Sequence, residues 1–177
     1  MTARITEDEW TPLKGAIPET VDADKVYLIP TRIAVQTGEK AESELCYTDT
    51  VRYLPKAARA NGLPLEFSQP EGERHYLQEF SADSELWSLG LTLMSMTSDW
   101  LILTVSLFIA HRADHQGWTH EQAQELPLRV LVAETETGRN IEIEGRGSEV
   151  IEALRVLQGE TIERKKGKTK KKVKHDG

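Results

Sequence analysis

The chain has 177 residues, of which 38% are hydrophobic and 29% are charged, and its formal net charge is −7. This length predicts one domain with a sizeable core, and the apolar content excludes a wholly disordered chain. The single cysteine, Cys46, excludes an intrachain disulfide framework and a cysteine-based zinc cluster. The acidic start, MTARITEDEW, is unlike a signal peptide, so we expect the protein in the cytoplasm.

The charge is divided unevenly along the chain. Residues 164–177, RKKGKTKKKVKHDG, hold eight of the 22 basic residues and one acidic residue, which gives them +7 and leaves −14 for residues 1–163. Because a body this acidic repels phosphate groups, we expect nucleic acid or an anionic membrane to contact only this basic tail. The tail lysines are Lys165, Lys166, Lys168, Lys170, Lys171, Lys172 and Lys174. Residues 161–177 are predicted to be disordered, since they have too little apolar surface to bury.

The N-terminal residues 1–24 mix proline, glycine and acidic residues without periodicity, and are predicted to form a loose lead-in. A single domain is predicted over 25–160. It begins with VYLIPTRIAV, residues 26–35, which is rich in β-branched residues. Pro30 cannot donate to a strand ladder, so this segment is predicted to be an edge strand or two short strands. The polar residues 37–44 are predicted to form a loop.

A helix is predicted over residues 48–61, ending at Asn61 and Gly62. Pro55 either kinks this helix or lies in the first turn of a shorter helix that begins near Leu54. Strands are predicted at 63–67 and 74–80, and these elements together give an N-terminal β-α-β-β portion.

Residues 86–110, LWSLGLTLMSMTSDWLILTVSLFIA, form the most apolar stretch, with Asp99 as its one charged residue. The main interpretation is a buried apolar helical hairpin over 84–113, broken at 97–99. Ser98 or Asp99 is a favourable N-cap for a second helix that begins at Trp100.

Two other interpretations of this stretch remain open. About 20 apolar residues are enough to span a membrane, although Asp99 near the middle makes a straight span costly by about 2.5–3.5 kcal/mol. The first part, WSLGLTL, also alternates with a period of two and is compatible with a β-strand.

The C-terminal part of the domain predicts a β-β-α unit over 126–158. LPLRVLV and IEIEG alternate as the two strands of a hairpin with a turn around Gly138. Ser148 is expected to cap a helix with an apolar stripe, and Gly159 is expected to end it. The predicted class is therefore α+β: a β-α-β-β portion, a central apolar helical hairpin, and a β-hairpin plus helix.

A histidine cluster follows the apolar stretch. His111, Asp114 and His115 share one face if the segment is helical, and His120 lies shortly after them. Two helical histidines with a further histidine or carboxylate form a workable zinc site, although the spacing matches no known metal motif. A solvated helix end explains the same residues.

The sequence offers little else that carries chemistry. It contains no G-x-S-x-G motif, no phosphate-binding P-loop and no dinucleotide fingerprint. GRGSE at 145–149 precedes a predicted helix and is compatible with anion binding, but it is more simply a strand-to-helix turn. We therefore predict no cofactor, no small-molecule substrate and no catalytic residues.

Roughly residues 75–158 resemble small, poorly characterised bacterial proteins encoded in immunity and conflict gene neighbourhoods. The resemblance lies in an apolar segment, LWSLGLTLMSMTSDWLILTVSLFIA, followed by a strand, a glycine turn, a strand and a helix in LPLRVLVAETETGRNIEIEGRGSEVIEALRVL. It implies an adaptor or effector-associated module that couples a sensor to an effector, and it carries over no catalytic residue.

These observations predict a non-enzymatic module for protein interaction or oligomerisation, because 25 nearly uncharged residues need a cover. Its expected partner is another protein or a second copy. The candidate interaction residues are Trp87, Leu91, Trp100, Leu103, Leu107 and Phe108. The alternatives are a small membrane-associated protein that inserts 86–110 and a metal-dependent enzyme that uses the histidines of 111–120.

Overall fold

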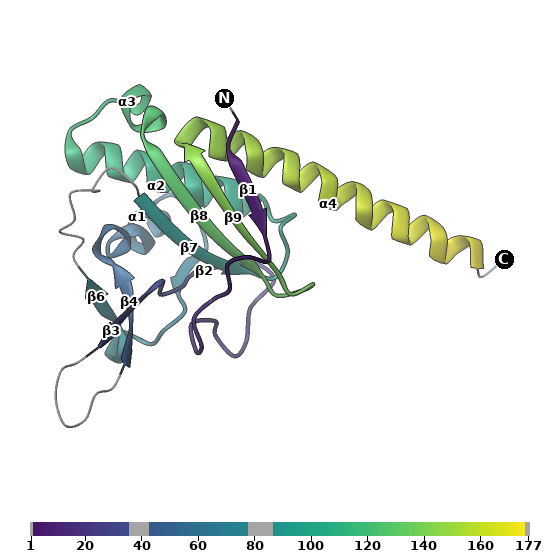
Figure 1. Cartoon of the computed structure of the whole chain (residues 1–177), viewed down its shortest axis with the longest axis horizontal. Coiled ribbons are helices and arrows are strands. Elements are labelled where there is room, and N and C mark those ends of the chain that lie inside the picture. The colour runs from purple at the N-terminus through teal and green to yellow at the C-terminus, as the bar shows by residue number, and fades with distance from the viewer. Residues whose placement is uncertain (1, 36–42, 78–86, 176–177) are drawn as a thin grey trace.

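The structure is a computed structural model that describes residues 2–35, 43–77 and 87–175, and their side chains except those of residues 35, 43 and 168–175. It combines two β-sheets with α-helices, which confirms the predicted α+β class (Figure 1).

The main sheet has six strands in the order β1-β9-β8-β7-β2-β5. Their bounds are Arg4–Glu7 for β1, Val26–Leu28 for β2, Leu65–Phe67 for β5, Trp87–Leu93 for β7, Pro127–Glu134 for β8 and Arg139–Arg146 for β9. The central strands β7 and β8 run parallel, as do β2 and β5, whereas β1–β9, β8–β9 and β2–β7 are antiparallel pairs. The parallel centre places the ends of β7 and β8 side by side.

The second sheet has three strands in the order β3-β4-β6. These are Arg32–Val35, Ser43–Thr48 and His75–Leu77. Between β4 and β5 lie the short 3-10 helix η1, Asp49–Val51, and helix α1, Leu54–Ala60, and η2, Glu71–Glu73, precedes β6. The other helices are α2, Asp99–Gln116, α3, His120–Glu125, and α4, Gly147–His175.

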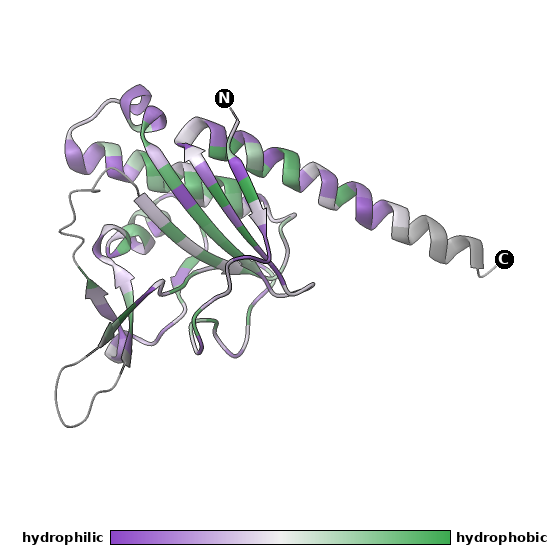
Figure 2. Ribbon diagram, viewed as in Figure 1, coloured by the Kyte–Doolittle hydropathy of each residue, from purple (hydrophilic) through white to green (hydrophobic). Residues whose placement is uncertain are grey.

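One hydrophobic core lies between the main sheet and the helices. Leu89 of β7, Phe108 of α2, Leu154 of α4 and Leu54 of α1 are each fully buried in it. Each such side chain contributes about 1.5–3 kcal/mol by leaving water. Figure 2 shows hydrophobic residues along the central strands and along the parts of α2 and α4 that lie against the sheet.

The predicted helical hairpin over 84–113 is wrong in its first half. Residues 87–93 form strand β7, which confirms the strand interpretation of WSLGLTL, while 84–86 lie outside the described residues. The apolar residues Trp87, Leu89, Leu91 and Leu93 alternate along the strand with Ser88, Gly90 and Thr92, and all seven residues are buried. β7 is strand because its backbone pairs with β8 on one side and β2 on the other, and because both of its faces are covered.

The second half of the hairpin is confirmed as helix α2. The Ser98 hydroxyl oxygen accepts a hydrogen bond from the Trp100 backbone nitrogen at 3.3 Å, as expected of an N-cap. Gly117 ends the helix in the left-handed conformation, with φ of 71°. Helix α3 begins with a capping box between Thr119 and Gln122.

The β-β-α unit over 126–158 is confirmed, with two corrections to its helix. α4 begins at Gly147 instead of being capped by Ser148, and the Arg146 backbone N–H donates to the Glu149 carboxylate at 3.0 Å. The helix also continues through Gly159, where we predicted its end.

The basic tail also differs from its prediction. Residues 161–175, predicted to be disordered, continue α4 as helix, and 176–177 lie outside the described residues. Thr161 is buried and extends the buried stripe of Leu154 and Leu157, and its hydroxyl donates to the Leu157 carbonyl at 2.8 Å. The C-terminal end of α4 projects away from the body as an arm (Figure 1).

Some elements of the N-terminal part agree with the sequence predictions, and one was missed. The lead-in 1–24 contains β1, which pairs with β9 at the sheet edge and was not foreseen because its residues are mostly exposed. Residues 26–35 form two short strands around Pro30, as one interpretation predicted. The shorter helix from Leu54 is also correct, with Pro55 in its first turn.

Three further predictions concern strands of this part and the loop between them. The strand predicted at 63–67 is β5, and that at 74–80 is β6 as far as 77, with 78–80 outside the described residues. The loop predicted at 37–44 is described only at 43–44, where β4 begins.

Candidate functional site: the groove along helix α2

The outer side of α2 carries an apolar stripe. Leu101, Val105 and Phe108 face the sheet and are fully buried. On the opposite side lie Trp100, Leu103, Leu107 and Ala110, at intervals of three, four and three residues. This is the spacing by which one helix presents a seam to another helix.

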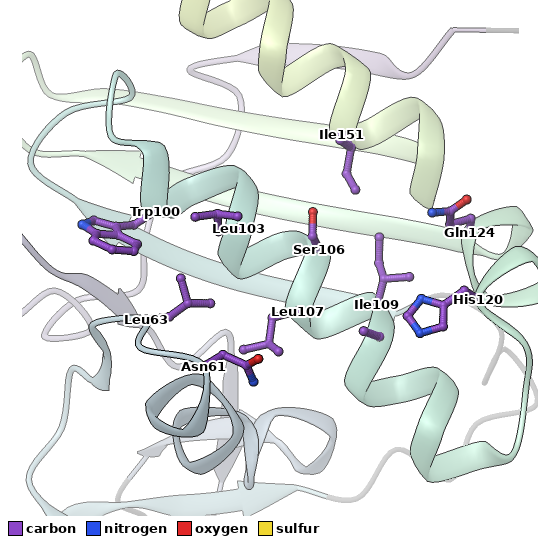
Figure 3. Close-up of a pocket in the computed structure, with 11 residues that line it drawn as sticks. Asn61, Leu63, Trp100, Leu103, Ser106, Leu107, Ile109, His120, Gln124 and Ile151 are labelled. Atoms are coloured by element: carbon purple, nitrogen blue, oxygen red, sulfur yellow. The ribbon is translucent and has the colours of Figure 1, made fainter.

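Segments from three other elements make this stripe the floor of a groove. Asn61 and Leu63 follow α1, Ile151 belongs to α4, and His120 and Gln124 belong to α3. Figure 3 shows these side chains around the outer surface of α2. The groove has a volume of about 470 Å³. Its lining is mainly apolar. Asn61, His120 and Gln124 add polar groups from the elements around α2, and the Ser106 hydroxyl is a polar group of α2 itself.

Leu103 is the most exposed apolar side chain of the groove. Of its surface 46% is accessible, whereas Trp100 and Leu107 are partly buried against the core. The stripe from Trp100 to Ala110 spans about 15 Å, since a helix rises about 1.5 Å per residue. A surface of this shape and chemistry suits an apolar, elongated ligand that lies along α2.

The groove contains half of the residues predicted as an interaction surface. Trp100, Leu103 and Leu107 line it. The structure corrects the other three, because Trp87, Leu91 and Phe108 are at most 2% exposed and belong to the core. Strand β7 turns the first two towards the helices, and Phe108 lies on the sheet side of α2.

The sequence did not indicate the residues that complete the groove. Asn61, Leu63, Ile151 and Gln124 come from segments far apart in the chain, and none belongs to a recognisable motif. The one available signal was the partly apolar side of α4 that includes Ile151. Only the packing of α1, α3 and α4 around α2 brings them together.

The predicted histidine cluster is divided between two places. The rings of His111 and His115 stack near the end of α2 with centroids 6.1 Å apart, whereas His120 lies in the groove on α3. Burial lowers the pKa of His111, the neighbouring His115 lowers it further, and Asp114 partly opposes this. Within residues 2–35, 43–77 and 87–175, no three histidine, cysteine or acidic side chains are grouped so that they could hold a metal ion.

An aromatic cluster, which was not foreseen, joins α2 and the residue after it to β7. The rings of Trp87 and Trp118 stack at 5.5 Å, and Phe108 meets Trp87 edge-on at 6.1 Å. The Arg112 guanidinium lies over the Trp87 ring, 5.4 Å from its centre. These contacts fix the end of α2 and the start of α3 against β7.

In the glycine-rich turn at 145–149, two backbone N–H groups donate hydrogen bonds to other groups of the chain. The Gly147 N–H donates to the Leu126 carbonyl at 3.2 Å, and the Arg146 N–H donates to Glu149. This is the arrangement of a strand-to-helix turn, which was the simpler of the two interpretations of this segment.

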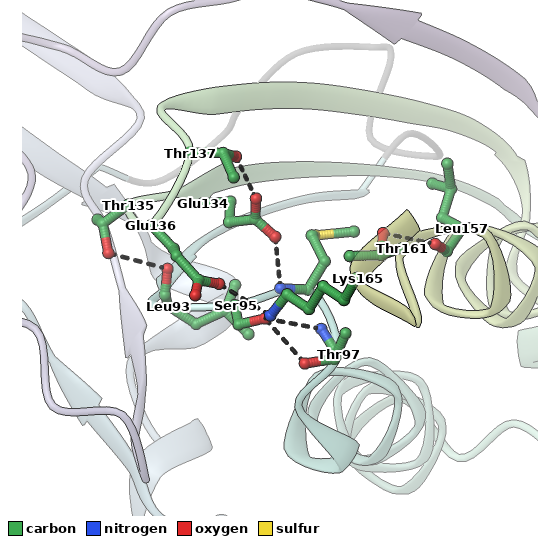
Figure 4. A network of polar contacts seen from close by, with 11 residues as sticks. Leu93, Ser95, Thr97, Glu134, Thr135, Glu136, Thr137, Leu157, Thr161 and Lys165 are labelled. Atoms are coloured by element: carbon green, nitrogen blue, oxygen red, sulfur yellow. Dashed lines mark hydrogen bonds and ion pairs between the residues drawn. The ribbon is translucent and has the colours of Figure 1, made fainter. Parts of the chain in front are cut away.

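The basic tail contacts the body through Lys165. Its Nζ atom lies 2.9 Å from both Glu136 Oε2 and Ser95 Oγ (Figure 4). Lys166 is exposed, and the side chains of the remaining tail lysines lie outside the described residues.

None of the helices in the described part of the chain is long and apolar enough to cross a membrane. The chain matches no protein-family model, no curated protein and no solved structure.

Proposed function

We propose that this protein is an interaction module that binds an amphipathic helix of another protein in the groove along α2. The observation that carries the proposal is the stripe of Trp100, Leu103, Leu107 and Ala110, which has the spacing of a helix–helix seam and lies at the surface. Helix-in-groove recognition uses such a stripe on both partners.

The size of the groove supports a helix as the ligand. A partner helix of about three turns covers the stripe, because each turn rises about 5.4 Å. Among the apolar side chains of the stripe, Leu103 would bury the most surface on binding, since nearly half of its surface is accessible in the free chain. Burying an apolar side chain of this kind contributes up to about 1–2 kcal/mol.

We extend the proposal to an adaptor role in a bacterial defence system. This extension rests on the resemblance of residues 75–158 alone. In that role the groove would hold the effector or the sensor, and the protein would need no catalytic group of its own.

The proposal can be tested with the full chain and a synthetic helical peptide that carries leucines at the same three- and four-residue spacing. The side-chain resonances of Trp100 and Leu103 are followed by NMR during the titration. We expect them to shift on binding, and we expect Leu103→Glu to lower the affinity at least tenfold. Val156→Glu is the matched control, because Val156 is an exposed apolar residue of α4, with 53% of its surface accessible, that is not part of the groove.

Two results would contradict the proposal. The first is an absence of binding by the wild-type chain, or binding that Leu103→Glu leaves unchanged. The second is a concentration-dependent dimer in light scattering that Leu103→Glu dissociates, since a second copy would then be the occupant of the groove.

A further inference from the structure

The last part of α4 is a basic helix that projects from the body (Figure 1). Residues 164–175, which we call the basic arm, hold eight of the 22 lysine and arginine residues and continue the helix to its end at His175. Lys165 still contacts the body through Glu136. The end of the helix lies about 15 Å further along the axis, since a helix rises about 1.5 Å per residue.

The basic arm has a high density of positive charge. Its eight cations occupy residues 164–174, about 16 Å of helix, so one cation occurs for about every 2 Å. Double-stranded DNA carries one negative charge for about every 1.7 Å of its axis. The linear charge density of the arm is therefore close to that of a DNA duplex, with the opposite sign.

The acidic body of a second copy is a poorer partner for the arm. A net charge of −14 on a molecule with 10946 Å² of surface gives about one net negative charge per 800 Å². The arm covers a strip of only about 16 Å by 10 Å. It would therefore meet less than one net negative charge on a second copy, against about nine phosphates on a duplex of the same length.

The composition of the arm also disfavours membranes, apolar protein surfaces and single strands. Val173 is its one hydrophobic residue, and Lys170, Lys171 and Lys172 occupy three different sides of the helix, because successive residues are about 100° apart. A helix that enters a membrane surface or packs on another protein needs an apolar side. The arm has no aromatic residue on which the bases of a single strand would stack.

We propose that the basic arm binds double-stranded DNA through its phosphate groups, with little dependence on base sequence. An α-helix is about 10–12 Å across and fits the major groove of B-DNA, which is about 12 Å wide, whereas that of double-stranded RNA is narrow. The arm holds one arginine, Arg164, and no asparagine or glutamine, so it has few of the side chains that identify bases.

The acidic body does not cancel this attraction at about 0.15 M salt, where charges more than about 8 Å apart are largely screened. The arm extends about twice that distance past Lys165, which lies at the body. The inference does not depend on the groove along α2, and it gives the protein a second binding site.

The experiment measures binding of the full chain to a fluorescently labelled duplex of about 20 base pairs by anisotropy, between about 50 and 200 mM salt. We expect the logarithm of the affinity to fall with the logarithm of the salt concentration with a slope of about −4 to −7, since each phosphate contact contributes about −0.9. A duplex of another sequence should bind equally within about twofold, and the single strand should bind at least about threefold more weakly.

A charge variant and its control locate the site. Lys171→Gln/Lys172→Gln should lower the affinity for the duplex at least about tenfold at 0.1 M salt and make the slope shallower by about 2. Lys14→Gln/Lys56→Gln makes the same change in net charge on exposed residues of the body. This control should leave the affinity within about twofold of the wild type.

A second pair of variants tests whether the arm binds as a helix. Thr169→Pro interrupts the helix and keeps every charge, so it should weaken binding to the duplex at least about threefold. Thr169→Ala keeps both the helix and the charges, and it should bind like the wild type.

Several results would overturn the inference. These are a slope shallower than about −2, equal or tighter binding of the single strand, unchanged affinity in the lysine-to-glutamine variant of the arm, or equal affinities of Thr169→Pro and Thr169→Ala. Binding to vesicles with about one-third anionic lipid, or self-association in light scattering, at a lower protein concentration than duplex binding would also overturn it. Each of these results leaves the proposed function standing, because the arm does not line the groove.

Discussion

The Oε2 atom of Glu134 lies 2.6 Å from the backbone nitrogen of Met96 and accepts its hydrogen bond. Glu134 is the last residue of β8 and is only 3% exposed, and its other carboxylate oxygen accepts from the Thr137 hydroxyl (Figure 4). This one side chain therefore joins the β8–β9 turn to the connection between β7 and α2. It fixes the point at which the apolar stretch changes from strand to helix.

The first prediction concerns this carboxylate. Glu134→Ala should lower the free energy of unfolding by about 2–3 kcal/mol, because it removes a hydrogen bond to a charged group and leaves the buried Met96 N–H without a partner. Urea titration measures the effect. Glu136→Ala is the control, since Glu136 forms an exposed ion pair with Lys165 and its removal should cost less than about 1 kcal/mol. Equal decreases for the two variants would contradict this account.

The second prediction concerns the close approach of two segments at Gly90. A Cβ at this position would overlap with Thr31 Cγ2 and lie 3.2 Å from the Ile29 carbonyl oxygen. Gly90→Ala should therefore lower the free energy of unfolding by about 1–3 kcal/mol, as expected for overpacking. Gly72→Ala, where a Cβ meets nothing within 4 Å, should change it little. Thermal and urea unfolding of both variants provides the comparison.

The third prediction tests whether α4 continues through Gly159. This glycine is helical and a Cβ there meets no atom within 4 Å, so Gly159→Ala should raise the free energy of unfolding by about 0.5–1 kcal/mol. Gly117→Ala should have the opposite effect, because Gly117 ends α2 with φ of 71°. A decrease in stability for Gly159→Ala in urea titration would mean that the helix ends there, as its sequence alone suggested.

The fourth prediction concerns the two stacked histidines. The pKa of His111 should lie below 6.5, and His115→Gln should raise it by removing a neighbouring positive charge, whereas Asp114→Asn should lower it. NMR titration of the imidazole protons measures each value. Because the unfolded chain then binds a proton more readily than the folded chain, the contribution of His111 to stability should fall as pH decreases below 6.5. A His111 pKa at or above 6.5 would show that burial does not control it.

The fifth prediction concerns the basic arm. Deleting residues 164–177 should lower the free energy of unfolding by less than about 1 kcal/mol, since the deletion removes the exposed Lys165–Glu136 ion pair and leaves the buried Thr161 in place. Affinity for a single-stranded oligonucleotide should be confined to the full chain and should fall steeply with added salt, because it depends on counterion release. Oligonucleotide binding by the truncated chain would require a basic site on the body instead.

The sequence by itself determined the elements whose signals are local. The capping residues Ser98 and Thr119 and the terminating Gly117 act within a few residues, so the bounds of α2 and the start of α3 were predictable. The hairpin of β8 and β9 was equally clear, because its alternating pattern surrounds a glycine turn at Gly138.

Only the tertiary structure decided the elements whose state depends on distant partners. The apolar residues 87–93 could form helix or strand, and they are strand because β8 and β2 supply hydrogen bonds on both sides. Past Gly159, α4 remains helical where Thr161 is buried against the body and Lys165 reaches Glu136. The groove depends in the same way on segments from α1 to α4, because a surface built from four separate segments has no signature in any one of them.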